Sequence, residues 1–180
     1  MTATARPTWL LDFDGVINIL AAQGDTSVWG EWKDYRRSSP DEIPWMIWAP
    51  EVAKLVREAH DAGVRVVWLT TWGALTETIS EVIPEIPKGL EYWTCGDLSR
   101  IGVTSRRSGQ NWKIDCARNL VPNDAPLLWT DDNLSTMLRT DDRTWLRTRK
   151  PETFTISPRK DIGLTPAHVR KIQNWMANVA

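Results

Sequence analysis

The sequence predicts an α/β fold, a three-layer sandwich with a central parallel sheet between two layers of helices. Short apolar runs, typical of strands buried on both faces, alternate along the chain with amphipathic segments of helical period. Polar residues close several of these runs, at the strand ends where open parallel sheets bind ligands. A chain of 180 residues, 42% of them hydrophobic, suits a single domain over residues 1–180.

The first half of the chain contains two expected strands and two expected helices. Residues 9–13 are apolar and end in carboxylates, and residues 64–70 form a second apolar run rich in β-branched side chains. A helix is expected at 51–62, because its apolar residues repeat at helical spacing between a leading proline and a trailing glycine. The next helix is expected at 74–82, where a proline soon stops it.

The second half repeats the alternation. Residues 112–120 are a helix candidate, and residues 126–130 are a buried strand that again ends in carboxylates. A short strand is expected at 154–156. A Thr-Pro pair then begins a final helix over about 165–178.

Composition narrows the possible functions. The formal net charge of -1 gives no overall attraction to nucleic acid or to an anionic membrane. The start resembles no secretory signal and no apolar run is long enough to cross a bilayer, so we expect a cytoplasmic protein without a membrane partner. Cys95 and Cys116 lack a paired metal spacing and are expected to be reduced thiols. With only two histidines in the chain, the acidic residues are the better candidates for chemistry.

Carboxylates close two of the predicted strands, Asp12 and Asp14 in the first and Asp131 and Asp132 after a later one. If these strands are neighbours, four carboxylates converge, and so many like charges need a compensating cation. Oxygen ligands with no histidine or cysteine nearby favour Mg²⁺, which also recruits substrate phosphate. A carboxylate is moreover an established covalent nucleophile in phosphoryl transfer.

Four segments resemble, in order, the motifs of the haloacid dehalogenase superfamily. LLDFDGVIN is similar to the first motif, with two aspartates one residue apart, and VVWLTTW to the second, with its strand ending at Thr70. Lys113 near the start of a predicted helix matches the third motif, and LLWTDDN matches the fourth. The resemblance covers roughly residues 9–133. Tryptophans beside the threonines and the lysine are also similar to a phosphatase module of RNA-repair proteins.

The resemblance implies a HAD-like, Rossmannoid hydrolase with a role for each motif residue. Asp12 would attack phosphorus and become an aspartyl phosphate. Asp14 would protonate the leaving oxygen and then activate the hydrolytic water. Thr70 would hydrogen-bond the transferring phosphoryl group, and Lys113 would balance its charge. The implied Mg²⁺ ligands are Asp12, Asp14 through its backbone carbonyl, Asp131 and, directly or through water, Asp132.

Several of these assignments have competitors in the sequence. Thr71 can take the place of its neighbour as the phosphoryl-binding threonine, and Lys88 is a second available lysine. Asp132 can be an indirect ligand or merely a turn former. Asp141 and Asp142 are expected in turns or at exposed helix ends, solvated.

The segments 15–50 and 73–111, where family members often insert a cap, are short here, which implies a capless, open site. Such a site admits the end of a large molecule, and aromatic side chains beside cations are typical of single-stranded nucleic-acid binding. A nucleotide or nucleic-acid end is therefore the expected substrate. The candidate substrate-binding residues are Thr71, Trp29, Trp32, Arg36 and Arg106. The competing interpretation is that Trp29 and Trp32 only pack a small flap, formed by part of the segment 15–50, onto the body of the protein.

Three other functions compete with this one. A phosphatase of small metabolites needs the same motifs, and a catalytically silent binding module keeps the fold without the chemistry. A receiver-like signalling domain also combines aspartates, a threonine and a lysine. It places the acidic pair first, whereas here the Asp-x-Asp pair opens the series and the adjacent aspartates close it.

Overall fold

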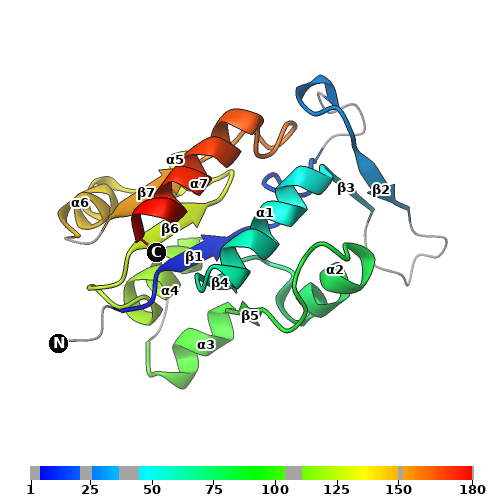
Figure 1. The fold of residues 1–180 in the computed structure, drawn as a ribbon. Helices are drawn as coiled ribbons and strands as arrows, with labels where there is room; N and C mark the ends of the chain where they lie inside the picture. The colour runs from blue at the N-terminus through cyan, green and yellow to red at the C-terminus, as the bar shows by residue number, and fades with distance from the viewer. Residues whose placement is uncertain (1–4, 21–25, 37–44, 104–110, 150–151, 180) are drawn as a thin grey trace.

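The fold is a five-stranded parallel sheet with helices on both faces, seen in a computed structural model that describes residues 5–20, 26–36, 45–103, 111–149 and 152–179 (Figure 1). All pairings in the sheet are parallel. The strand order is β5-β4-β1-β6-β7. The strands span β1 Thr8–Leu11, β4 Arg65–Trp68, β5 Glu91–Tyr92, β6 Leu127–Thr130 and β7 Thr153–Ile156.

The strand order reverses direction at β1. From β1 the chain proceeds to β4 and β5 on one side and returns to place β6 and β7 on the other. Leu11 is in register with Trp68 of β4 and with Thr130 of β6, so the three central strands end at one level. A crevice at such a switch point is where open α/β sheets bind ligands, and the residues after these three strands meet there.

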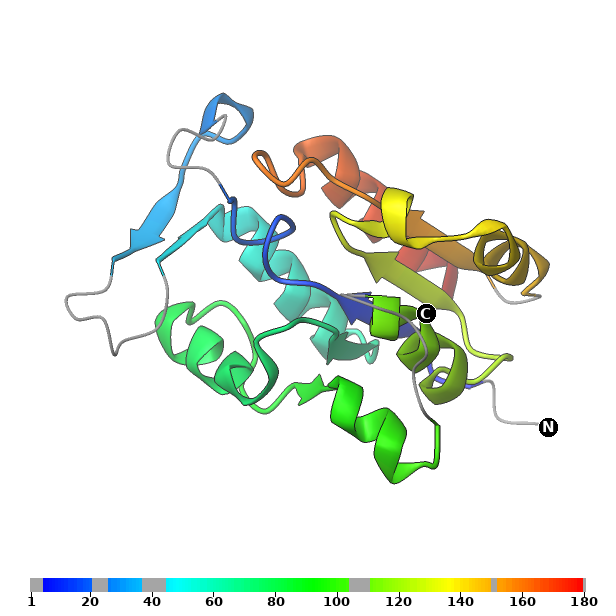
Figure 2. The same cartoon turned by 180° about the vertical axis from the view of Figure 1, so that it is seen from behind.

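Helices cover both faces of the sheet (Figure 2). Alternate strand residues contribute to two separate apolar clusters, with Trp9 and Leu11 in one and Leu10 in the other, as expected for strands buried on both sides. The first cluster contains side chains of α1 Pro50–Asp61, α2 Thr76–Val82 and α7 Pro166–Val179. The second contains side chains of α3 Cys95–Arg100, α4 Trp112–Leu120, α5 Leu134–Met137 and α6 Thr140–Thr148.

The α/β class, the parallel sheet and the main elements agree with the sequence-based expectation. The helix expected at 112–120 has those bounds. The strands expected at 9–13 and 64–70 extend past the ends of β1 and β4, because Asp12 and Thr70 leave the ladder to form the site, whereas β6 and β7 end at the expected residues. Trp9, Trp68 and Trp129 are fully buried, as apolar segments predict. Strand β5 and helices α3, α5 and α6 were not expected, and the 3-10 turn η2 Gly73–Leu75 precedes α2.

One expectation about an acidic residue is wrong. Asp142 is buried rather than solvated, because it lies in the first turn of α6 and faces the protein. Its carboxylate accepts hydrogen bonds from Arg118 Nη2 at 2.8 Å and from the backbone N–H of Arg139 at 3.0 Å. It therefore stabilises the start of α6 and ties that helix to α4.

The segment between β1 and α1 carries a small flap. Its described part contains the 3-10 turn η1 Thr26–Val28 and an antiparallel pair of strands, β2 Lys33–Tyr35 and β3 Met46–Trp48. The flap extends from the edge of the molecule beside α1 (Figures 1 and 2). Among the described residues, none of the helices combines the length and apolar character that crossing a membrane needs.

Candidate active site

A buried lysine joins the ends of β1 and β6 at the switch point. Lys113, the second residue of α4, has its Nζ 2.8 Å from Asp12 Oδ2 and 2.8 Å from Asp131 Oδ2. The remaining oxygens of these carboxylates accept backbone hydrogen bonds, Asp12 Oδ1 from Phe13 and Asp131 Oδ1 from Asn133, each at 2.8 Å. The three side chains are therefore held in one arrangement by two strands, a helix and their own backbone.

These charges lie in the interior of the protein. Asp131 and Lys113 are completely buried and Asp12 is 4% exposed. Burial raises the pKa of Asp12 to about 7, although the charge of Lys113 opposes the rise. Burial likewise raises the pKa of Asp131. Burial alone would lower the pKa of Lys113, but the charges of Asp12 and Asp131 outweigh it and the pKa rises, so the lysine is a fixed cation.

Asp132 completes an acidic group that one lysine cannot neutralise. Asp12, Asp131 and Asp132 each offer a carboxylate oxygen within 4.8 Å of the others, the arrangement a cation could occupy. Burial and the charge of Asp12 raise the pKa of Asp132. Gly15 allows the close approach, because a Cβ at this position would lie 2.7 Å from Asp132 Cγ, and its φ of +73° also favours glycine. This donor set fits a divalent cation that prefers oxygen.

Asp14 lies outside that acidic group, and one donor from its own turn and one from the segment after β4 hold its side chain. Its Oδ1 accepts a hydrogen bond from Asn18 Nδ2 at 2.7 Å, and its Oδ2 accepts one from Trp72 Nε1 at 2.8 Å. Sequence reasoning missed both donors. The Asp14↔Asn18 pairing is a local turn that the Asp-x-Asp pattern does not specify, and Trp72 reaches Asp14 only through the tertiary fold.

The threonine predicted to bind phosphate follows β4 into the same crevice. Thr70 is 2% exposed, and its Oγ1 has no hydrogen-bond partner among the described residues. A buried hydroxyl without a partner is uncommon and calls for a ligand or water. Its competitor Thr71 is exposed, and the competing lysine, Lys88, is exposed in the loop after α2.

Three of the residues expected to bind substrate lie in the flap, where each contacts other groups of the protein. Trp29 packs against the first apolar cluster and donates through Nε1 to the carbonyl of Leu164, and Trp32 also packs there and donates to the carbonyl of Thr26. Arg36 is exposed, pairs with Asp34 at 2.9 Å and lies 5.2 Å above the ring of Trp45. Arg106 lies outside the described residues. A nucleic-acid partner therefore stays a prediction.

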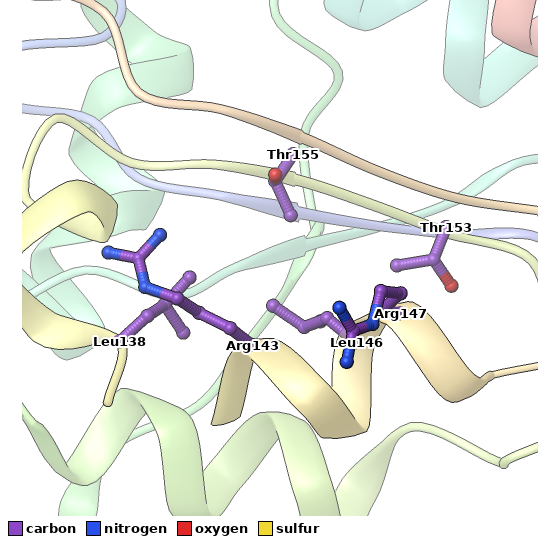
Figure 3. A pocket seen from close by; sticks show the side chains of 6 residues that line it. All are labelled: Leu138, Arg143, Leu146, Arg147, Thr153 and Thr155. Atoms are coloured by element: carbon purple, nitrogen blue, oxygen red, sulfur yellow. The ribbon is translucent and has the colours of Figure 1, made fainter. Parts of the chain in front are cut away.

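An open groove of about 280 Å³ lies between α6 and the strand β7 (Figure 3). Arg143 and Arg147 project from successive turns of α6, with Thr153 and Thr155 opposite them. The lining includes no member of the acidic group, and Arg143 donates to the carbonyl of Ser135 at 2.7 Å. The groove is thus distinct from the candidate active site.

No family model, curated protein or solved structure matches this chain. The functional conclusion accordingly depends on the geometry of its own residues.

Proposed function

We propose that the protein is a Mg²⁺-dependent phosphatase of the haloacid dehalogenase type, which hydrolyses a phosphate monoester through an aspartyl phosphate on Asp12. The observation that carries this proposal is the contact of Lys113 with Asp12 and Asp131 at the switch point, 2.8 Å to each, with Asp132 beside them. Three converging carboxylates and one cation leave an excess of negative charge that a metal ion offsets and that phosphate alone would worsen.

The residues that would hold Mg²⁺ are Asp12, Asp131 and Asp132, with the backbone carbonyl of Asp14 as a further ligand. The ion supplies charge neutralisation of the phosphate oxygens, so that an anionic nucleophile can approach. Thr70 offers its free hydroxyl to the phosphoryl group. Lys113 offsets charge on Asp12 and on the phosphoryl oxygens, because its pKa keeps it protonated.

Two steps complete the reaction. In the first, an oxygen of Asp12 forms a bond to phosphorus while the ester oxygen leaves and receives a proton from Asp14. In the second, water attacks phosphorus, Asp14 takes its proton, and the bond between Asp12 and phosphorus breaks to release inorganic phosphate. Asp14 thus returns to its starting protonation state, and the nucleophile is regenerated.

A phosphatase assay tests this proposal directly. The purified protein should release phosphate from a panel of nucleotides, sugar phosphates, phosphopeptides and 3′- or 5′-phosphorylated oligonucleotides in millimolar Mg²⁺, and EDTA should abolish the release. A preference for the oligonucleotides would support the nucleic-acid end as substrate, and a preference for sugar phosphates would support a metabolite phosphatase. Absence of turnover across the panel would favour a silent binding module.

Magnesium binding should strengthen as the pH rises from 6 to 8. Below its folded pKa of about 7, Asp12 holds a proton that the ion must displace. Burial also raises the pKa of Asp131 and of Asp132, so protons compete with the ion for these two carboxylates as well when the pH falls. Each tenfold gain in affinity adds about 1.4 kcal/mol of stabilisation at saturating ion. Thermal melts in Mg²⁺ and in EDTA should therefore separate more at pH 8 than at pH 6.

Two variants locate that effect. Asp131→Ala should shrink the separation at both pH values, whereas Asp124→Ala, which removes an exposed carboxylate before β6, should leave it unchanged. Identical melts in Mg²⁺ and EDTA at both pH values would contradict a metal site at the switch point.

A further inference from the structure

The side chain of Asp14 is held by hydrogen bonds at both of its oxygens. Asn18 donates to Oδ1 at 2.7 Å and Trp72 donates to Oδ2 at 2.8 Å. Asn18 belongs to the turn that follows β1, whereas Trp72 lies beyond the end of β4. The two donors therefore lie in the loops that follow two different strands, and together they restrain rotation of the carboxylate.

Both donors are themselves fixed. Asn18 is 4% exposed, and its Oδ1 accepts the backbone N–H of Ile47 in β3 at 2.8 Å, so its amide cannot rotate without losing that bond. The Trp72 ring packs edge-on against Phe13, with ring centroids 5.0 Å apart and an interplanar angle of 76°. The orientation of Asp14 is thus tied to the flap through Asn18 and to the nucleophile's own loop through Phe13.

The two hydrogen bonds leave Asp14 able to transfer a proton. Each carboxylate oxygen can accept at about two lone-pair positions, and only one on each is used by Asn18 or Trp72. The remaining positions can carry the proton for the leaving oxygen or accept one from water. Such a restraint favours the geometry of proton transfer without competing for it.

We propose that Trp72 and Asn18 are positioning residues for Asp14, which direct its carboxyl group for proton transfer in both steps. The proposal depends on the phosphatase function given above. Trp72 acts through its indole N–H and does not touch the reacting phosphoryl group. Its removal should therefore matter most where the leaving oxygen needs a proton.

A pair of matched substrates isolates that requirement. p-Nitrophenyl phosphate releases a nitrophenolate that leaves without a proton, whereas p-nitrobenzyl phosphate, of similar shape, releases an alkoxide that needs one. Trp72→Phe keeps a ring against Phe13 and removes the donor. It should lower kcat/KM for p-nitrobenzyl phosphate by about tenfold to a hundredfold, and that for p-nitrophenyl phosphate by less than about threefold. kcat/KM is the informative quantity because it reports only the steps up to departure of the leaving group.

Trp93→Phe is the matched control. Trp93 is buried, whereas Trp72 is partly buried, and like Trp72 it donates its indole N–H to a carboxylate. Its acceptor is Glu91, on the β5 edge of the sheet. This variant should treat the two substrates as the wild-type protein does. Asn18→Ala should reproduce the selective loss of Trp72→Phe, with a lower melting temperature because the N–H of Ile47 loses its acceptor.

The outcomes separate the two proposals. Equal losses of kcat/KM on both substrates in Trp72→Phe, as general loosening of the site would give, or no loss at all, would overturn the positioning role while the phosphatase function stands. Wild-type protein that hydrolyses neither substrate in Mg²⁺ would overturn the phosphatase function and, with it, the positioning role.

Discussion

Asp12→Asn should abolish phosphate release, with a fall in kcat of about 10⁴-fold or more. The amide is nearly isosteric and can still accept the Phe13 N–H through its oxygen, but it lacks the anionic oxygen that attacks phosphorus and is a poorer metal ligand. Lys113 retains Asp131 as its ion-pair partner, so the fold should persist. A phosphate-release assay measures the loss of turnover, and a circular dichroism melt of the same preparation measures whether the fold persists.

The control for this substitution is Asp34→Asn, which neutralises an exposed aspartate of the flap. It should retain wild-type turnover. Asp14→Asn should instead slow both steps, because it removes the group that gives and takes the proton, and aspartyl phosphate should accumulate. A folded Asp12→Asn protein with wild-type kcat would remove Asp12 from the mechanism.

Lys113→Met should produce the largest loss of stability. The substitution keeps an apolar stem of similar length but leaves two buried carboxylates facing each other without their cation. Breaking a buried ion pair in this way typically costs about 3–5 kcal/mol of unfolding free energy. Urea denaturation in metal-free buffer should show this loss, and phosphatase activity should fall with it.

The loss should deepen with pH in a defined direction. The folded pKa of Asp12 is about 7, raised from an unfolded value of 3.8, so the folded state binds the proton more tightly. The protonated Asp12 therefore contributes to the free energy of unfolding, and this contribution is fully present below pH 3.8 and is lost as the pH rises through 7. Without Lys113 to oppose the rise, the folded pKa should be higher still. The difference between Lys113→Met and wild type should therefore be larger at pH 8 than at pH 5.

Lys88→Met is the matched control, because Lys88 is an exposed lysine that the sequence alone allows as a competitor. It should change neither stability nor activity. Unfolding of Lys113→Met at the wild-type urea concentration at both pH values would contradict a stabilising role for the buried lysine. Loss of activity in Lys88→Met would transfer the lysine's catalytic role to that residue.

The predictable part of the fold is the part set by local sequence. Buried parallel strands are nearly continuous apolar runs, and the residues that close them lie at one edge of the sheet, so the sequence alone predicts that Asp12, Thr70 and Asp131 lie close together. The period of the strands and the topology of a parallel sheet are enough for that inference. The place of Lys113 in the site came instead from the resemblance of its segment to the third motif of the family.

The unpredicted part depends on tertiary contacts. Asp142 lies in a polar stretch that is typical of a solvated turn, yet it is buried in the first turn of α6, where Arg118 of another helix pairs with its carboxylate. Strand β5 has only two residues and no apolar signature, since both of its side chains are exposed. Trp72 reaches Asp14 only through the tertiary fold, and the contact of Asn18 with Asp14 depends on a local turn that the Asp-x-Asp pattern does not specify.

The covalent intermediate is the most direct test of the proposed chemistry. Wild-type protein mixed with Mg²⁺ and its best substrate from the panel, quenched in acid within the first turnovers, should carry one phosphate on the peptide that contains Asp12. Asp14→Asn should increase the phosphorylated fraction, and Asp12→Asn should show none. Phosphate release by wild-type protein with no phosphopeptide in either wild type or Asp14→Asn would contradict Asp12 as the nucleophile, as would a phosphate found on another residue.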